Sequence, residues 1–148
     1  MSATRLIQTA IYAVLSADST LAALSLTYNS SGALTTVTVH NDIPDGAAYP
    51  HVLISRASET PWHTFGTATT GLGWKDIIRI HVYSRYQGDK EAMQIHERIV
   101  ALLNFQSLTV TGYPTALVEY EQMRLMVEDV EKIETRHLVG EFCVMVHQ

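Results

Sequence analysis

Hydrophobic residues recur every three or four positions in two segments of the chain. The first set lies near the N-terminus and comprises Leu6, Ile7, Ala10, Ile11, Val14 and Leu15. The second set follows a Gln-Gly-Asp turn and comprises Ala92, Ile95, His96, Ile99 and Leu103. Because this spacing places each set on one face of a helix, it predicts two principal helices. We expect Asp89 to be the N-cap of the second helix and Asp18 to cap a short turn after the first.

Segments typical of strands fill most of the remaining chain. They are HVLIS at 51–55, the alternating stretch 76–86, LVEYEQMRLMV at 117–127 and RHLVGEFCVMVH at 136–147. An acidic connection from Glu128 to Glu134 separates the last two, and a turn cluster at 29–32 predicts a further hairpin. The order of elements predicts an α+β fold: a mostly antiparallel sheet of four to six strands with two principal helices packed on one face.

Length, charge and cysteine content narrow the class of protein. The chain has 148 residues, which predicts a single domain spanning 1–148. Its net charge is −5 with the ten basic residues dispersed, so tight binding to nucleic acid is not expected. Cys143 is the only cysteine, which excludes an intramolecular disulfide. Polar interruptions near the N-terminus favour an amphipathic helix over a signal peptide, and no membrane span is predicted.

The residues that could carry chemistry form no motif typical of an enzyme. The seven histidines include no HExxH spacing. His81 and His96 would meet if the second helix packs back on the strand before it, which is the one candidate metal pair. Cys143 shares its strand face with His137 and His147, but they lie roughly 20 and 13 Å away along an extended chain. We therefore expect neither catalysis nor a cofactor or metal, and a small metal- or ligand-binding enzyme is the most remote alternative.

The strand at 76–86 has a polar face that calls for an explanation. Its members are Arg79, His81, Tyr83 and Arg85, opposite Ile78, Ile80, Val82 and Ser84. Arginine and tyrosine are enriched where proteins bind proteins, because each combines a large contact area with directional hydrogen bonds. An ordinary solvated sheet face is the alternative interpretation.

An irregular segment is predicted at 58–75, the longest in the chain. It contains Trp62, Phe65 and Trp74. Loops of this length are uncommon in compact domains and are usually functional or mobile. Its aromatic side chains must either fold back on the core or bind a partner, which favours an interaction site.

Four stretches, taken in order and spacing, carry a resemblance to a known family. They are IYAVLSADSTLAAL, HNDIPDGAAYPHVLIS, IIRIHVYSRYQGDKEAMQIHERIVALL and RHLVGEFCVMV. Together they resemble the tail-completion or tail-terminator proteins of long-tailed bacteriophages. The chain departs from the usual pattern in NSSGALTTVTV, which looks like an inserted hairpin, and in the acidic connection, which lacks a short Asp-Gly turn.

The resemblance implies a structural role in the virion, at the head-proximal end of the tail, for a protein made in the host bacterial cytoplasm. Proteins of this family form a homo-oligomeric ring, typically a hexamer, on the tail-tube protein. The ring stops tube polymerisation and joins the tail to a head-tail connector or stopper protein, and DNA passes through its lumen without specific binding. A stopper or connector is the nearest alternative function. On this basis the interface would include Arg79, His81, Tyr83, Arg85, Trp62, Phe65 and Trp74.

Overall fold

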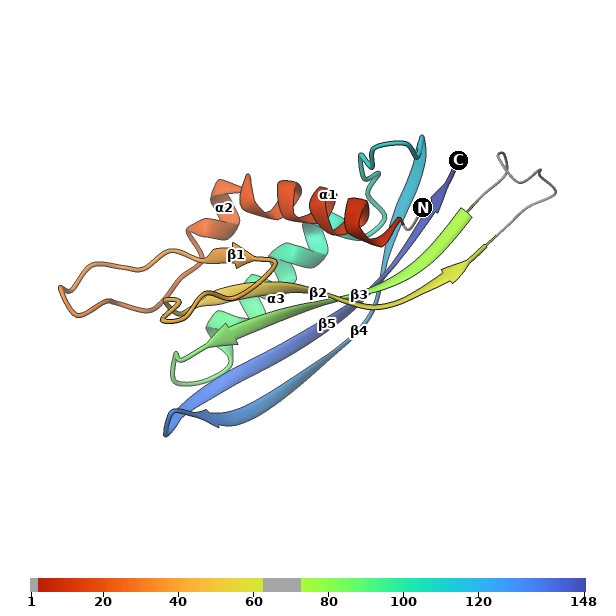
Figure 1. Ribbon diagram of the computed structural model, residues 1–148. Coiled ribbons are helices and arrows are strands. Elements are labelled where there is room, and N and C mark those ends of the chain that lie inside the picture. The colour runs from red at the N-terminus through yellow and green to blue at the C-terminus, as the bar shows by residue number, and fades with distance from the viewer. Residues whose placement is uncertain (1–2, 63–72) are drawn as a thin grey trace.

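A five-stranded sheet forms the centre of the protein (Figure 1). The computed structural model describes residues 3–62 and 73–148. The strands are β1 (Thr38–His40), β2 (His51–Pro61), β3 (Gly73–Ser84), β4 (Thr115–Val130) and β5 (Ile133–His147). They are arranged in the order β1-β2-β3-β5-β4, and only the β1–β2 pair is parallel. The sheet is therefore mostly antiparallel, as the sequence predicts.

Two principal helices cover one side of this sheet (Figure 1). They are α1 (Thr4–Ser16) and α3 (Lys90–Leu103), and a single turn, α2 (Ser19–Ala22), follows α1. Ile7, Ile11 and Leu15 of α1 are buried, and so is the whole predicted stripe of α3. The predicted fold class is confirmed. No helix in the described part of the chain is long and apolar enough to cross a membrane.

The core lies between the helices and the inner face of the sheet. Ile78, Ile80 and Val82 alternate inward on β3, and Phe142 faces the same layer from β5. All four side chains are almost completely buried. Burial of each such side chain contributes roughly 1.5–3 kcal/mol, which is why the alternating pattern specifies the register of β3 so strongly.

The structure differs from the predicted irregular segment at 58–75 in the residues that it describes. Residues 58–61 continue β2 and pair with residues 74–77 of β3, so the prediction is wrong at both of its ends. A bulge at residue 57 shifts the register and interrupts the alternation that would have revealed the strand. Gly73 begins β3 where a Cβ atom would lie 2.3 Å from the carbonyl oxygen of Trp62, so the close approach requires glycine. Phe65 lies outside the described residues.

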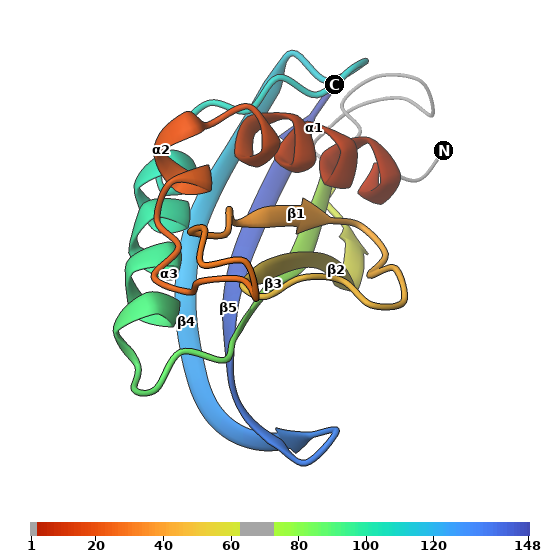
Figure 2. The same cartoon turned by 90° about the vertical axis from the view of Figure 1, so that its left-hand side faces the viewer.

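The predicted acidic connection from Glu128 to Glu134 is also wrong. β4 and β5 continue through most of it and leave a turn of two residues, Glu131 and Lys132. Both have positive φ angles, 53° and 63°, as a type I′ hairpin turn requires. The sequence hid this turn because neither position carries the asparagine or glycine that usually marks it. Figure 2 shows the resulting hairpin curving away from the helices and projecting beyond the other strands.

Three predicted local features have mixed outcomes. The carboxylate of Asp18 caps α2 by accepting a hydrogen bond from the Leu21 N–H at 2.8 Å, as predicted. Asp89 is the residue before α3, but its side chain does not cap the helix. The turn at 29–32 forms, yet only one bridge, between Tyr28 and Leu34, flanks it. The predicted inserted hairpin is thus a turn with a minimal ladder.

Candidate interaction surface

The outer face of the sheet, opposite the helices, collects the predicted polar residues. Because successive side chains of a strand point to opposite faces, Arg79, His81 and Tyr83 face away from the buried isoleucines of β3. In the register of the sheet, His81 lies between Leu53 and Val139, and Tyr83 lies between His51 and His137. Neighbouring strands therefore build this surface together with β3.

A chain of hydrogen bonds crosses the outer face from β2 to β4. Ser55 Oγ lies 2.9 Å from His81 Nε2, and His81 Nδ1 lies 2.8 Å from His137 Nε2. His137 Nδ1 in turn lies 3.0 Å from a carboxylate oxygen of Glu128. The Tyr83 ring stacks on the His137 ring with the centroids 4.3 Å apart. Each imidazole therefore has a partner for both of its nitrogens, which fixes the orientation of the rings.

The protonation state of this chain follows from its burial. Burial, together with the nearby His137 and Arg79, lowers the pKa of His81 to about 4. Burial also raises the pKa of the Tyr83 hydroxyl. His81 is accordingly neutral at physiological pH, where one of its nitrogens donates a hydrogen bond and the other accepts one.

The Ser55–His81 contact has the distance expected for a nucleophile and its base, but not the surroundings. A base with a pKa of about 4 has little tendency to take a proton at neutral pH. Ser55 also lies within the β2–β3 ladder, directly opposite Arg79, and its hydroxyl contacts the Arg79 carbonyl oxygen at 3.3 Å. Backbone N–H groups of paired strands lie in the plane of the sheet and bond to neighbouring strands, so they form no oxyanion hole here. The chain of hydrogen bonds is structural.

A pocket of about 270 Å³ opens on the same face beside these histidines. It is lined by Arg79, His81, Gln122, Met123, Arg124, Met126, His137, Val139 and Glu141. The Glu141 carboxylate accepts hydrogen bonds from Gln122 and from Arg79, each at 3.1 Å, and both bonds lower the pKa of Glu141. The Arg79 side chain nevertheless remains 49% exposed, and Arg124 is exposed. We refer to these nine residues as the outer-face pocket.

Sequence reasoning missed the part of the pocket that β4 contributes. A bulge between Tyr120 and Gln122 shifts the alternation of β4 by one residue. Gln122, Arg124 and Met126 consequently share the outer face, although simple alternation from Leu117 puts them on the inner one. A strand of sixteen residues rarely alternates between the two faces without interruption. Nothing in the sequence, however, marks residue 121 as the position of the bulge.

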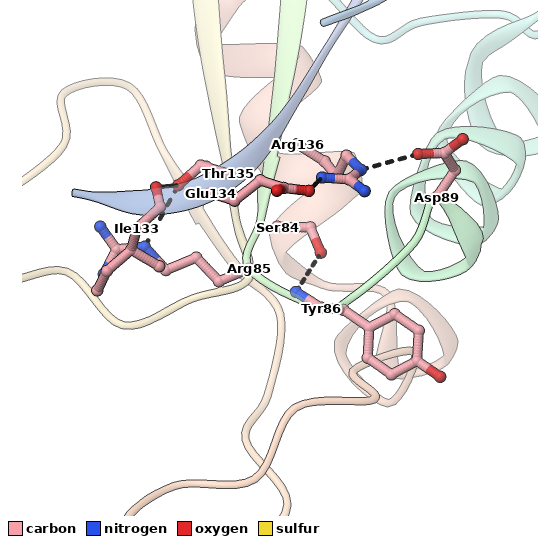
Figure 3. Close-up of polar contacts among 8 residues, drawn as sticks. All are labelled: Ser84, Arg85, Tyr86, Asp89, Ile133, Glu134, Thr135 and Arg136. Atoms are coloured by element: carbon pink, nitrogen blue, oxygen red, sulfur yellow. Dashed lines mark hydrogen bonds and ion pairs between the residues drawn. The ribbon is translucent and has the colours of Figure 1, made fainter. Parts of the chain in front are cut away.

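Arg85 lies at the end of β3 and makes contacts within its own chain. Its guanidinium group lies 4.0 Å from the centroid of the Tyr49 ring and donates a hydrogen bond to the Val130 carbonyl at 3.2 Å. It also contacts the Thr135 hydroxyl at 3.4 Å and the Glu131 carboxylate at 3.7 Å. Figure 3 shows this side chain directed at β5. Arg85 therefore holds the β4–β5 hairpin against β3.

The two histidines of the candidate metal pair lie on opposite faces of the sheet. His96 is buried on the helix side over Gly140, where a Cβ atom would lie 2.8 Å from its ring. Its Nε2 atom lies 3.2 Å from the Tyr120 hydroxyl, and burial lowers its pKa. Because His81 lies on the outer face, His81 and His96 cannot bind one metal ion together. Within residues 3–62 and 73–148, no group of three or more potential ligands converges on a metal position.

Two of the predicted aromatic residues lie at the other end of β3 from Tyr83. Trp62 is 47% exposed, and its ring lies 6.0 Å from that of His147. Trp74 is partly buried and packs against the core. The structure thus brings neither tryptophan to the outer-face pocket. Cys143 is buried, and burial raises the pKa of its thiol, as expected of a packed side chain.

The family to which the sequence belongs follows from a match over almost the whole chain. The family described as Tail completion protein gp17 matches residues 9–146. The chain belongs to this family. Tail completion proteins are structural components of the virion tail and not enzymes, which agrees with the outer face having structural contacts in place of a catalytic site.

Solved structures support the fold of this tail completion protein. One is a chain of the virion of a native gene transfer agent particle, with a TM-score of 0.68 and 22% identity. The match covers 99% of this chain and 98% of that chain. A second solved structure has a TM-score of 0.55 and 17% identity, covering 100% of this chain and 96% of its own. No curated protein matches the sequence.

Proposed function

We propose that this tail completion protein forms a ring, most simply a hexamer, on the head-proximal end of the tail tube. The ring ends tube polymerisation and provides the surface on which the tail joins the head. The observation that carries the proposal is the family match over residues 9–146. Its partners are further copies of the chain, the tail-tube protein and a connector or stopper protein on the side of the head.

A closed ring needs two different contact surfaces on every subunit, because each copy meets one neighbour on each side. The outer face is one such surface, since it presents exposed arginines and methionines around a pocket. Arg79, His81 and Tyr83 belong to that face, whereas Arg85 supports it from within. Trp62, which follows β2, is available for the tube or the head-side protein, and Phe65 and Trp74 are candidates for the same contact.

The charge of the chain suits a passage for DNA. Fifteen acidic and ten basic residues give a net charge of −5. A ring of like-charged subunits repels the phosphate backbone, which favours passage over adhesion, and no specific DNA binding is expected.

Tube polymerisation in the presence of the purified protein tests the proposal. Tail-tube protein is allowed to polymerise with and without this protein, and tube length and tube ends are measured by electron microscopy. We expect shorter tubes with additional density at one end. Unchanged tubes would contradict the proposal, and binding only to the head-side ring would identify a stopper or connector.

A further inference from the structure

The end of the β4–β5 hairpin projects from the body of the protein with its apolar side chains exposed. Figures 1 and 2 both show this end, residues 127–134, reaching beyond the helices and the other strands. Val127 is 59% exposed and Ile133 is 46% exposed. We refer to residues 127–134 as the hairpin arm. Two exposed aliphatic side chains on a projecting hairpin have no place in the core of their own chain, so the arm is suited to binding a partner.

The arm is also acidic. It carries the carboxylates of Glu128, Asp129, Glu131 and Glu134 against the single cation of Lys132, so its net charge is 1 − 4 = −3. Glu128 is engaged by His137 and Glu131 lies 3.7 Å from Arg85, but Asp129 and Glu131 both remain exposed. A partner surface for the arm therefore needs cations at its rim and apolar side chains between them.

Contacts with Arg85, Asp89 and Arg136 hold the arm in one position. Arg136 donates a hydrogen bond to Asp89 at 3.0 Å and also pairs with Glu134 (Figure 3). Arg85 donates a hydrogen bond to the Val130 carbonyl. The turn at the tip contains only two residues. A pre-organised segment loses little conformational freedom when it docks, which favours its use in an interface.

The outer-face pocket has the matching chemistry. The pocket is lined by two cationic side chains, Arg79 and Arg124, and by one carboxylate, Glu141. Its apolar lining comes from Met123, Met126 and Val139. The charge of the pocket with neutral histidines is 2 − 1 = +1, opposite to that of the arm. Because β4 and β5 themselves form part of this pocket, the arm at their end cannot fold back into it. An arm that docks in the pocket therefore belongs to another molecule.

We propose that the hairpin arm of one copy docks on the outer-face pocket of a neighbouring copy. Asp129 and Glu131 of the arm meet Arg79 and Arg124 of the pocket, while Val127, which shares a strand face with Asp129, covers the apolar side chains of the pocket. This contact is head-to-tail, with a different surface from each subunit, and repeated contacts of this kind close a ring. The inference rests on the proposed ring function and names the surfaces that form the ring.

Charge reversal provides the test. In an arm variant, Asp129→Lys and Glu131→Lys make the arm basic; in a pocket variant, Arg79→Glu and Arg124→Glu make the pocket acidic. Each variant alone places like charges at every contact. An equimolar mixture restores opposite charges at every contact, because a basic arm meets an acidic pocket and an acidic arm meets a basic pocket. The two variants should therefore assemble together in alternation.

Assembly is measured by light scattering on size-exclusion columns, without and with short tail tubes. We expect each variant alone to need at least about tenfold more protein than wild type to assemble, which corresponds to about 1.4 kcal/mol. The mixture should return to wild-type behaviour. Matched controls reverse equally many charges at other exposed residues, Asp42→Lys with Asp45→Lys, and Arg5→Glu with Arg56→Glu. These controls should assemble normally.

The outcomes separate this inference from the proposed function. If wild-type protein forms rings and each single variant also assembles normally, the arm-to-pocket contact is wrong. The same holds if the mixture of the two variants does not recover wild-type assembly. Neither result contradicts the ring function. Arm variants that form normal rings but no longer bind tubes would assign the arm to the tube protein and also overturn the inference. Wild-type protein that neither assembles nor caps tubes would overturn the ring function itself.

Discussion

Single residues explain both how the outer face is organised and why the sequence did not reveal it. The sequence places His81 on the polar side of its strand, but its partners Ser55 and His137 come from other strands. These partners lie 26 and 56 residues away from His81 along the chain. The sequence does not reveal such contacts, because they depend on the register between strands. The stripe of α3 was predictable, since its spacing lies within one helix.

Asp76 is the buried residue whose charge is least compatible with its surroundings. It is fully buried, neither carboxylate oxygen has a hydrogen-bond partner, and it lies opposite Glu59 in the β2–β3 ladder. Burial, together with the nearby charge of Glu59, raises the pKa of Asp76 to about 6. Between pH 3.8 and about 6 the folded state therefore binds more protons than the unfolded state. Stability due to this residue is lost as the pH rises through that window.

Replacement of Asp76 by asparagine should remove the free-energy cost of burying a charged carboxylate. At pH 7–8 we expect Asp76→Asn to be more stable than wild type by roughly 1–3 kcal/mol, with the difference vanishing near pH 4. Urea unfolding at several pH values measures it. Glu97→Gln, which removes an exposed carboxylate from α3, is the control and should show no such trend. A difference between Asp76→Asn and wild type that does not change with pH would contradict the assigned cause.

At the scale of elements, periodicity succeeded where it was unbroken and failed at bulges and turns. α1, α3 and the centre of β3 each keep one pattern from end to end, so their residues could be assigned from the sequence. The bulge at residue 57 hid the end of β2, and the bulge beside Gln122 hid the residues that β4 contributes to the pocket. Each bulge adds one residue without any change in composition, and one residue is sufficient to exchange the two faces of a strand.

The turn between β4 and β5 gives a prediction about this element. Glu131 and Lys132 both adopt positive φ angles, which cost energy for residues with a Cβ atom. Glu131→Asn with Lys132→Gly supplies the pair preferred in a type I′ turn, and we expect a gain of roughly 0.5–1 kcal/mol in the free energy of unfolding. The ion pair lost with Glu131 is exposed and worth little.

The matched control for this turn replaces the same two residues by alanine. That double variant removes both side chains without favouring positive φ angles, so it should be no more stable than wild type. Chemical denaturation of the three proteins under one set of conditions makes the comparison. Equal stability of the Asn-Gly and Ala-Ala variants would show that the φ angles of the turn do not limit the stability of the hairpin.

At the scale of the whole molecule, the protein separates a core that holds the fold from surfaces that carry the proposed assembly. The helices and the inner face of the sheet form one continuous core. The outer-face pocket and the hairpin arm adjoin each other along β4 and β5, whereas the exposed Trp62 lies beside the first residue of β3. The resemblance in sequence indicated the class of assembly, but the two surfaces proposed to join subunits became visible only with the strand register.

The segment between β2 and β3 links the fold to the proposed tube contact. The Trp62 N–H donates a hydrogen bond to the Gly73 carbonyl at 2.7 Å, so the two strand ends already lie side by side. Replacement of residues 63–72 by Asn-Gly should therefore leave the fold intact. The shorter loop lowers the entropy of closure, and we expect stability to be unchanged or higher by about 1 kcal/mol.

The same loop variant should form rings but cap tubes poorly, because we assign this end of the sheet to the tube or head-side partner. Thermal unfolding, ring formation and tube length are measured on one preparation. A control that replaces residues 63–72 by ten glycine and serine residues keeps the loop length and should lose capping equally. If the shortened protein caps tubes normally, the partner contact lies elsewhere on the ring. If it fails to fold while the control folds, the length of the segment is needed for the β2–β3 pairing, and its sequence is not.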